Sequence, residues 1–145
     1  MINLKQRITP EQLAELSDEQ RERLRDWWKP QAGGFVVINW KQDYIGMFLV
    51  IHVYPEHVLV GGMADEVKFE KDKVLPLLSI GQMVELLSQR RPVDISFLTN
   101  EKTWDVMVLN DYSPKGEEGA YWGDGPDWER DELVDALWEA VKEVL

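Results

Sequence analysis

Three motifs of one type fix where helices of this chain begin. In each, a Thr or Ser is followed three residues later by Gln: Thr9–Gln12, Ser17–Gln20 and Ser79–Gln82. In such a capping box the hydroxyl accepts a hydrogen bond from the backbone N–H three residues on, and the Gln side chain accepts one in return. The sequence therefore predicts two short tandem helices before Pro30 and a third helix that ends before Pro92.

The C-terminal segment has the pattern of an amphipathic helix, which we predict from about Glu129 to Leu145. Its apolar residues share one face at helical spacing. The opposite face is acidic, although like charges four residues apart destabilise a helix by roughly 0.2–0.5 kcal/mol per pair. This acidic face is either a surface for a basic partner or, as we favour, a solvated face that keeps the protein in solution. This acidic ridge consists of Asp131, Asp135, Glu139 and Glu143.

Between the helices, segments rich in β-branched and aromatic residues alternate with turn residues. The short connections between successive strands imply antiparallel pairing. We therefore predict an α+β fold, a single domain over residues 1–145, with N-terminal helices, one middle helix and a C-terminal amphipathic helix packed on one face of a mostly antiparallel sheet. The expected strands are Phe35–Trp40, Tyr44–Val53, Val58–Gly61, a charged edge strand Glu66–Glu70, and a hairpin of Val93–Leu98 and Trp104–Leu109.

The chain is large enough to bury an apolar core without help from a metal or a disulfide. It has 145 residues, 44% of them hydrophobic, and seven Trp, and a chain of this length can bury roughly two-thirds of its unfolded surface. The core residues expected from helical and strand spacing are Leu16, Leu24, Trp28, Val50, Ile51, Ile80, Met83, Leu87, Val106, Leu137 and Val141.

The sequence lacks most of the residue patterns that carry enzyme chemistry. It has no Cys and two His, His52 and His57, which flank a predicted turn at Tyr54–Glu56. Two imidazoles and the Glu56 carboxylate would make a three-ligand zinc set, but the spacing matches no ligand signature, so we interpret both histidines as structural. The sequence also contains no Gly-rich phosphate loop and no calcium loop. We predict no metal, no cofactor, no catalytic residue and no enzymatic activity.

Charge argues for a basic protein partner. The formal net charge is -11, and residues 111–145 hold three basic and eleven acidic residues, a net charge of -8. Because affinity for nucleic acid comes from Lys and Arg that displace counterions, direct nucleic-acid binding is not expected. No apolar stretch approaches the length of a membrane span, and the first residues do not have a signal-peptide pattern. We expect a cytoplasmic protein without membrane contact, and a homo-oligomer is compatible with the sequence.

A long connection, Asp111–Trp128, is the main candidate for a binding surface. It holds four Gly, two Pro and four aromatic residues, and irregular connections longer than about 12–15 residues are usually functional or disordered. Aromatic residues beside carboxylates can form a protein-binding hot spot, or they can pin the loop to the domain. Together with the start of the last helix, the candidate binding residues are Tyr121, Trp122, Asp124, Asp127, Trp128, Asp131 and Asp135.

A resemblance to known proteins is carried by three helical segments. Thr9–Pro30 (TPEQLAELSDEQRERLRDWWKP), Leu75–Leu87 (LPLLSIGQMVELL) and Glu132–Leu145 (ELVDALWEAVKEVL) resemble small uncharacterised proteins encoded in phages and prophages of Gram-positive bacteria. These segments cover 49 of the 145 residues, and the strands carry none of the likeness. The resemblance implies a phage or prophage context. Because those proteins have no assigned activity, the resemblance gives no catalytic residues to carry over to this chain.

Three functional classes follow from these observations. We expect a small acidic non-enzymatic phage or prophage protein that binds another protein. The first alternative is an acidic inhibitor that mimics nucleic acid and blocks a host DNA-binding protein, which requires carboxylates in a phosphate-like array. A second, less favoured alternative is a hydrolase, which requires two carboxyl groups roughly 5–9.5 Å apart in a cleft. The spatial arrangement of the carboxylates distinguishes these classes.

Overall fold

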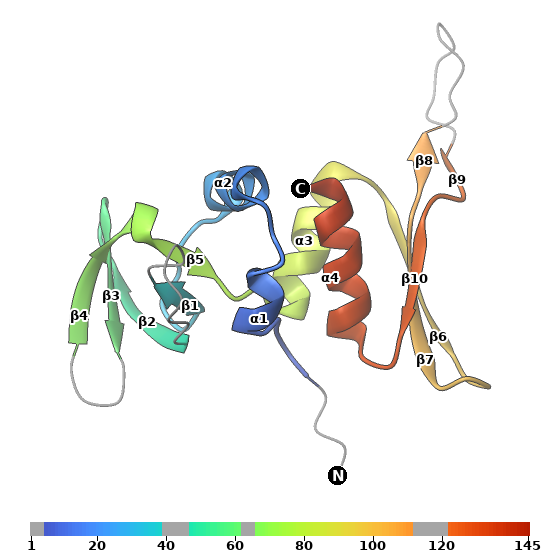
Figure 1. Cartoon of the computed structure of the whole chain (residues 1–145), viewed down its shortest axis with the longest axis horizontal. Helices are drawn as coiled ribbons and strands as arrows, with labels where there is room; N and C mark the ends of the chain where they lie inside the picture. The colour runs from blue at the N-terminus through green and yellow to red at the C-terminus, as the bar shows by residue number, and fades with distance from the viewer. Residues whose placement is uncertain (1–4, 39–46, 62–65, 112–121) are drawn as a thin grey trace, which may run out of the picture. The chain divides into compact units, whose positions relative to one another are not determined.

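The computed structural model describes residues 5–38, 47–61, 66–111 and 122–145 (Figure 1). The chain divides into two compact units: an N-terminal unit, Arg7–Leu78 with Leu145, and a C-terminal unit, Met1–Gln6 with Ser79–Val144. The predicted α+β class is confirmed, with helices at the start, middle and end of the chain and antiparallel sheets. A single domain stays a prediction. In the described ranges, no helix combines the length and the apolar character needed to span a membrane.

The two predicted N-terminal helices are confirmed, and their capping boxes are formed. Helix α1 (Pro10–Leu13) follows Thr9, and helix α2 (Asp18–Trp27) follows Ser17. The Gln12 backbone N–H donates to Thr9 Oγ1 at 3.1 Å, and the Gln20 N–H donates to Ser17 Oγ at 3.2 Å. These local hydrogen bonds satisfy backbone donors that a helix start leaves unpaired, which is why the sequence alone located both starts.

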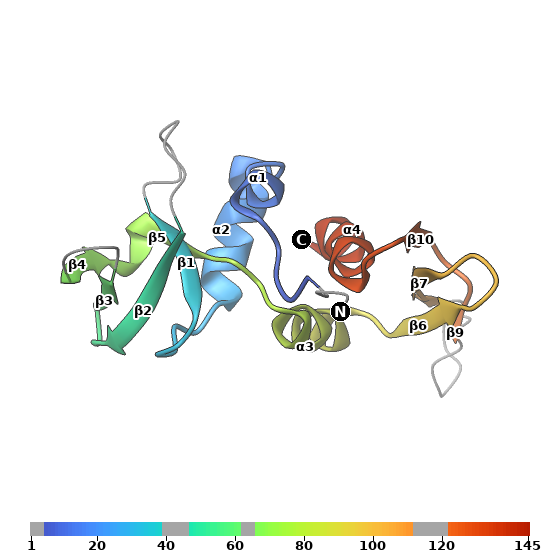
Figure 2. The ribbon, with the colours of Figure 1, turned by 90° about the horizontal axis from the view of Figure 1, so that it is seen from below.

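The N-terminal unit contains a five-stranded antiparallel sheet in the order β4-β3-β2-β1-β5. Helix α2 lies beside β1 (Figure 2), and its aromatic end packs on one face of the sheet. Trp28 joins the buried valines and Ile38 of that face, while Trp27 is partly buried against them. The strands are β1 (Phe35–Ile38), β2 (Met47–Val53), β3 (His57–Gly61), β4 (Glu66–Glu70) and β5 (Val74–Pro76), with a 3-10 turn η1 (Lys71–Lys73) before β5.

Several predicted features of this sheet change in the structure. The charged edge strand Glu66–Glu70 is confirmed, whereas the short strand β5 was not expected. Residues 39–40 and 44–46 of the predicted strands lie outside the described residues. Ile51 was expected in the core but is 39% exposed. The register of β2 against β3 shifts between Val50 and His52, and this irregularity leaves Ile51 packed over Gly61, where an added Cβ would lie 2.6 Å from Ile51 Cδ1.

In the C-terminal unit one helix packs on a three-stranded sheet, and a second helix packs against the first. Helix α3 (Ile80–Arg90) begins at the predicted Ser79 capping box and packs against helix α4 (Leu133–Val144). Helix α4 in turn contacts strands β7 and β10 of a sheet in the order β10-β7-β6. The strands are β6 (Val93–Leu98), β7 (Thr103–Val108) and β10 (Asp127–Arg130), and a separate two-stranded ribbon joins β8 (Asn110–Asp111) to β9 (Trp122–Gly123).

The predicted start of the last helix was wrong. The prediction began at Glu129, but residues Asp127–Arg130 form strand β10, and the helix begins at Leu133. Pairing with β7 explains the difference, because Trp128 lies opposite the buried Val106 and so gains a sheet position beneath the helix. The helical phase was correct: Leu137 and Val141 are fully buried.

Leu137 tests the core of the C-terminal unit. Its side chain is 0% exposed, so Leu137→Ala removes contacts and leaves a cavity, and it should lower the free energy of unfolding by about 2–5 kcal/mol. Chemical denaturation followed by circular dichroism measures this loss. Leu49→Ala is the matched control, because Leu49 is 40% exposed, and it should cost far less. An equal loss for both variants would contradict the assigned packing.

Candidate functional site

Strand register places four carboxylates on one face of the three-stranded sheet. Residues opposite each other in adjacent strands share a face, and side chains alternate along each strand. Met107 lies between Asp94 and Asp127, and Asp105 lies between Ser96 and Glu129. Asp94, Asp105, Asp127 and Glu129 therefore occupy the same side of the sheet, which we call the acidic face.

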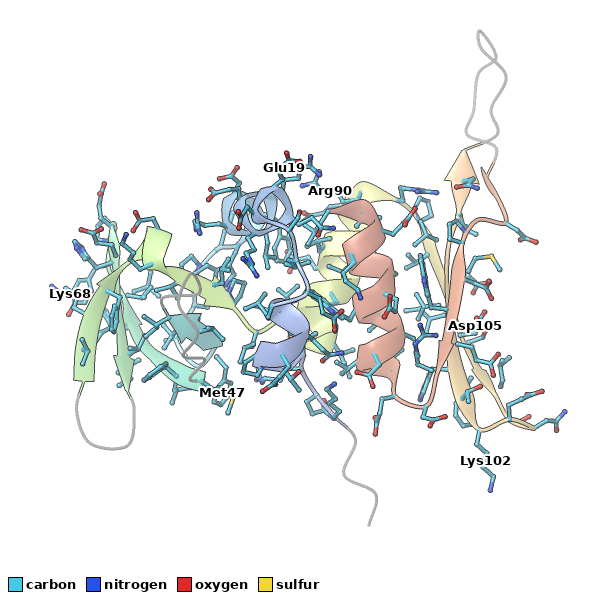
Figure 3. All side chains as sticks on the ribbon, in the orientation of Figure 1. Glu19, Met47, Lys68, Arg90, Lys102 and Asp105 are labelled. Atoms are coloured by element: carbon cyan, nitrogen blue, oxygen red, sulfur yellow. The ribbon has the colours of Figure 1, made fainter. Side chains whose placement is uncertain are left out.

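The opposite face of the same sheet forms the core. Val106 and Val108 of β7 are 0% exposed, and helix α4 covers this side. Ile95 and Trp128 lie on either side of Val106 and are half-buried. The acidic face is consequently the outer face. Figure 3 shows the Asp105 side chain on the side of the sheet away from α4.

Asp105 lies at the centre of the acidic face, where the neighbouring carboxylates repel its negative charge. Burial raises the pKa of the Asp105 carboxyl, and a hydrogen bond to Asp127 together with repulsion from Asp127, Glu129 and Asp94 raises it further. Thr103 Oγ1 donates to Glu129 Oε1 at 2.6 Å on the same face. In the described strands β6, β7 and β10, the outer-face positions hold no Lys or Arg. Arg130, which pairs with Trp104, lies on the helix side.

The sequence-predicted binding residues are distributed over several surfaces. Tyr121 lies outside the described residues, and for Trp122 the structure gives the backbone, which pairs with Asp111 in the β8–β9 ribbon. Asp124 is exposed, and its carbonyl oxygen lies 3.5 Å from the Asn110 side-chain nitrogen. Asp127 is exposed on the acidic face.

The remaining three candidates lie elsewhere. Trp128 is half-buried on the helix side of β10, so its side chain points away from the acidic face that Asp127 shares. Asp131 is exposed just before α4, and Asp135 forms an ion pair with Lys5 at 2.6 Å. The structure therefore places these residues on different surfaces. Their role in binding stays a prediction.

Sequence reasoning did not select Asp94 and Asp105. A signal for them was present, because the predicted hairpin with a four-residue turn places Leu98 opposite Thr103 and thereby puts both carboxylates on one face. The approach of Asp127 and Glu129 had no such signal. It depends on pairing of β10 with β7, whereas the sequence predicted Asp127 as part of the long connection and Glu129 as the start of the last helix.

The acidic ridge of the last helix is partly neutralised within the unit. Besides the pair of Asp135 with Lys5, Glu139 lies 3.2 Å from the Lys142 ammonium and 3.8 Å from the Arg130 guanidinium. Asp135 and Glu139 are each about one-third exposed. These contacts favour the interpretation of the ridge as a structural and solvated face.

The two histidines lie in neighbouring strands but face different partners. The His52 ring contacts the Tyr54 ring edge-on, with ring centroids 4.6 Å apart, and His57 lies opposite Glu70. Within the described part of the chain, no three His, Asp or Glu residues are grouped so that they could hold a metal ion. The acidic face is therefore the cluster of titratable side chains that remains as the candidate site.

Comparison of the chain with models of protein families, with curated proteins and with solved structures found no match. The candidate site consequently rests on its own geometry and chemistry.

Asp105→Asn should stabilise the protein at neutral pH. The folded-state pKa of Asp105 is raised above 3.8, the ordinary value for the unfolded chain. At pH values between 3.8 and the raised pKa, the native state therefore binds more protons than the unfolded state. The free energy of unfolding then falls as pH rises through this window. An Asn side chain removes the charge and can donate to a neighbouring carboxylate, so we expect a gain of about 0.2–1 kcal/mol.

Urea denaturation of both proteins across this pH range measures the effect. The gain should shrink as the pH falls through the raised folded-state pKa of Asp105 toward 3.8, and little of it should remain well below 3.8, where Asp105 is protonated in both states. Glu101→Gln, at an exposed position of the β6–β7 turn, controls for the loss of one negative charge. A gain that is the same at every pH would show that repulsion at Asp105 is not its cause.

Proposed function

We propose that this protein is a non-enzymatic binding protein that holds a basic segment of another protein on its acidic face. The observation that carries the proposal is the placement of Asp94, Asp127 and Glu129 on the same face as Asp105, whose pKa is raised by burial and by these acidic neighbours. Carboxylates that repel one another in the free protein gain more from a bound cation than isolated ones, because the cation relieves the repulsion as well as pairing with a charge.

The dimensions of the acidic face suit a short cationic segment. Its carboxylates lie on three adjacent strands, which span roughly 10 Å because neighbouring strands are about 4.8 Å apart. An Arg guanidinium binds carboxylates in a bidentate fashion, so one or two Arg or Lys side chains can engage this area. Thr103 and Ser96 add hydroxyl groups to the same face.

The alternatives fit this geometry less well. A nucleic-acid mimic needs carboxylates along an extended path like that of a phosphate backbone, whereas the four carboxylates here form a compact group on adjacent strands. A hydrolase needs two carboxyl groups that flank a scissile bond in a cleft. Asp105 and Asp127 instead share a hydrogen bond on the outer face of a sheet.

The cellular setting is part of the proposal. The likeness of the three helical segments to phage and prophage proteins supports a phage or prophage origin, and we place the protein in the cytoplasm. The target would then be a host or phage protein with a basic surface segment. Attraction between opposite charges would speed the encounter and would weaken as salt is added.

Neutralising the acidic face should reduce binding to a polycation. Poly-L-lysine serves as the probe, and isothermal calorimetry at low salt measures its affinity. The double variant Asp94→Asn/Asp127→Asn should bind about tenfold or more weakly than the natural chain, because two close charge pairs are lost. The control Asp72→Asn/Glu143→Gln removes the same charge from exposed positions outside the acidic face and should bind nearly as well as the natural chain.

The control variant shows whether the polycation binds to the acidic face specifically or is attracted by the net charge of the protein. If both double variants lose the same affinity, net charge alone attracts the polycation and the acidic face is not a binding site. The two carboxamides at Asp94 and Asp127 should also relieve repulsion at Asp105, so the fold of that variant should be retained, as circular dichroism would verify.

A further inference from the structure

We propose that strand β6 pairs with β6 of a second copy of this chain, antiparallel and about a two-fold axis at Ile95. The three-stranded sheets of the two copies would then form one continuous six-stranded sheet. This inference concerns the edge of the sheet, and it goes beyond the binding role proposed for the acidic face.

Backbone hydrogen bonds show which groups of β6 face outward. The Leu109 N–H donates to the Pro92 carbonyl at 3.0 Å, and bonded pairs recur every second residue in an antiparallel ladder. Residues 94, 96 and 98 therefore bond to β7. The same alternation appears on the other side of β7, where the Val108 N–H donates to the Pro126 carbonyl at 2.9 Å. The N–H and C=O groups of Val93, Ile95 and Phe97 point away from the sheet.

Strand β6 lacks the protection that the other long edge strands carry. Exposed edges are usually blunted by charged residues or Pro. Edge strand β4 contains Lys68 and Glu70, and edge strand β10 is charged at three of its four positions. Strand β6 reads VDISFL, with Asp94 as its one charge, and its Phe97 is 46% exposed. In the described part of the chain, β6 has β7 as its one strand partner.

Register selects a two-fold axis at Ile95. Outward-facing residues must pair with outward-facing residues, and pairing Ile95 with Ile95 of the second copy also pairs Val93 with Phe97. This arrangement uses all three outward-facing residues of each copy and forms about six backbone hydrogen bonds. With an axis at Asp94 or Ser96, fewer of the outward-facing residues of β6 would find a partner within the strand of the second copy.

Side chains agree with this register on both faces. On the helix side, Val93 meets Phe97 of the second copy and Ile95 meets Ile95, so the apolar row continues across the joint. On the outer side, Asp94 meets Ser96 of the second copy, whose hydroxyl can donate to the carboxylate. A symmetric axis at Asp94 would instead place two carboxylates directly opposite each other, which is unfavourable.

Cysteine cross-linking tests the register, because the natural chain has no Cys. Asp94→Cys and Ser96→Cys lie on the exposed outer face. In the proposed dimer their Cα atoms are about 4.5 Å apart across the joint, within the range for a disulfide. Two Asp94→Cys chains would hold their introduced residues roughly 7–8 Å apart, too far for a bridge.

A mixture of the two variants with oxidised glutathione should therefore give a disulfide-linked dimer, and each variant alone should give at least about tenfold less. Sedimentation of the natural chain should show a dimer that increases with protein concentration. Salt should strengthen dimerisation, because it screens the repulsion between the two acidic faces. Equal linking of the mixture and of each variant alone, or a natural chain that sediments as a monomer at every soluble concentration, would overturn the proposal.

A blocking variant separates this inference from the proposed function. Ile95→Pro removes an N–H that β7 does not use, and Pro is tolerated at such edge positions. It should raise the dissociation constant of the dimer by about tenfold or more, since two hydrogen bonds are lost per dimer. The acidic face is unchanged, so the variant should still bind poly-L-lysine. A folded Ile95→Pro chain that dimerises like the natural chain would refute the edge pairing.

Discussion

The alternation of strand β7 is the constraint on which the C-terminal unit depends. Val106 and Val108 are fully buried on the side covered by α4, whereas Asp105, between Trp104 and Val106 in the alternation, lies on the outer face. A slip of one residue would exchange the two sets and place the Asp105 carboxylate beneath the helix. Burial of an unpaired charge is costly, so the register is strongly specified. The acidic face is thus a consequence of the same register that forms the core.

Two acidic surfaces of this unit differ in how their charge is balanced. On α4, Asp135 and Glu139 are partly buried and have Lys5, Lys142 and Arg130 as partners. On the sheet, the charged neighbours of Asp105 are carboxylates, and its pKa is raised first by burial and then by these neighbours. These cations partly neutralise the helix ridge within the folded unit. The crowded sheet face is where an external cation would gain most, and this contrast places the proposed binding on the sheet.

Local chemistry was predictable from the sequence, and long-range pairing was not. The capping boxes at Thr9, Ser17 and Ser79 involve atoms three residues apart, so each could be recognised without any tertiary information. Strand β10 could not be recognised in this way, because its first two residues end the predicted long connection, its last two were included in the predicted helix, and its extended form depends on pairing with β7. The exposure of Ile51 likewise depends on an irregular register between β2 and β3. Half of the acidic face was hidden for the same reason, since Asp127 and Glu129 come from β10, whereas the predicted hairpin already implied that Asp94 and Asp105 share one face.

The proposed edge pairing uses backbone groups of β6, and the proposed binding uses carboxylates on the outer face, yet the two would influence each other. A two-fold axis perpendicular to the sheet keeps both acidic faces on the same side, with the two Asp94 residues roughly 7–8 Å apart. Pairing of the edges therefore concentrates negative charge, which opposes dimerisation and favours a polycation that spans both copies. By linkage, a cationic partner that binds across the joint must stabilise the dimer by the same factor by which dimerisation raises its affinity. A partner with two basic segments would gain further from the high effective concentration of the second face. The unprotected edge and the crowded carboxylates would then act together in one assembly, which a basic partner completes.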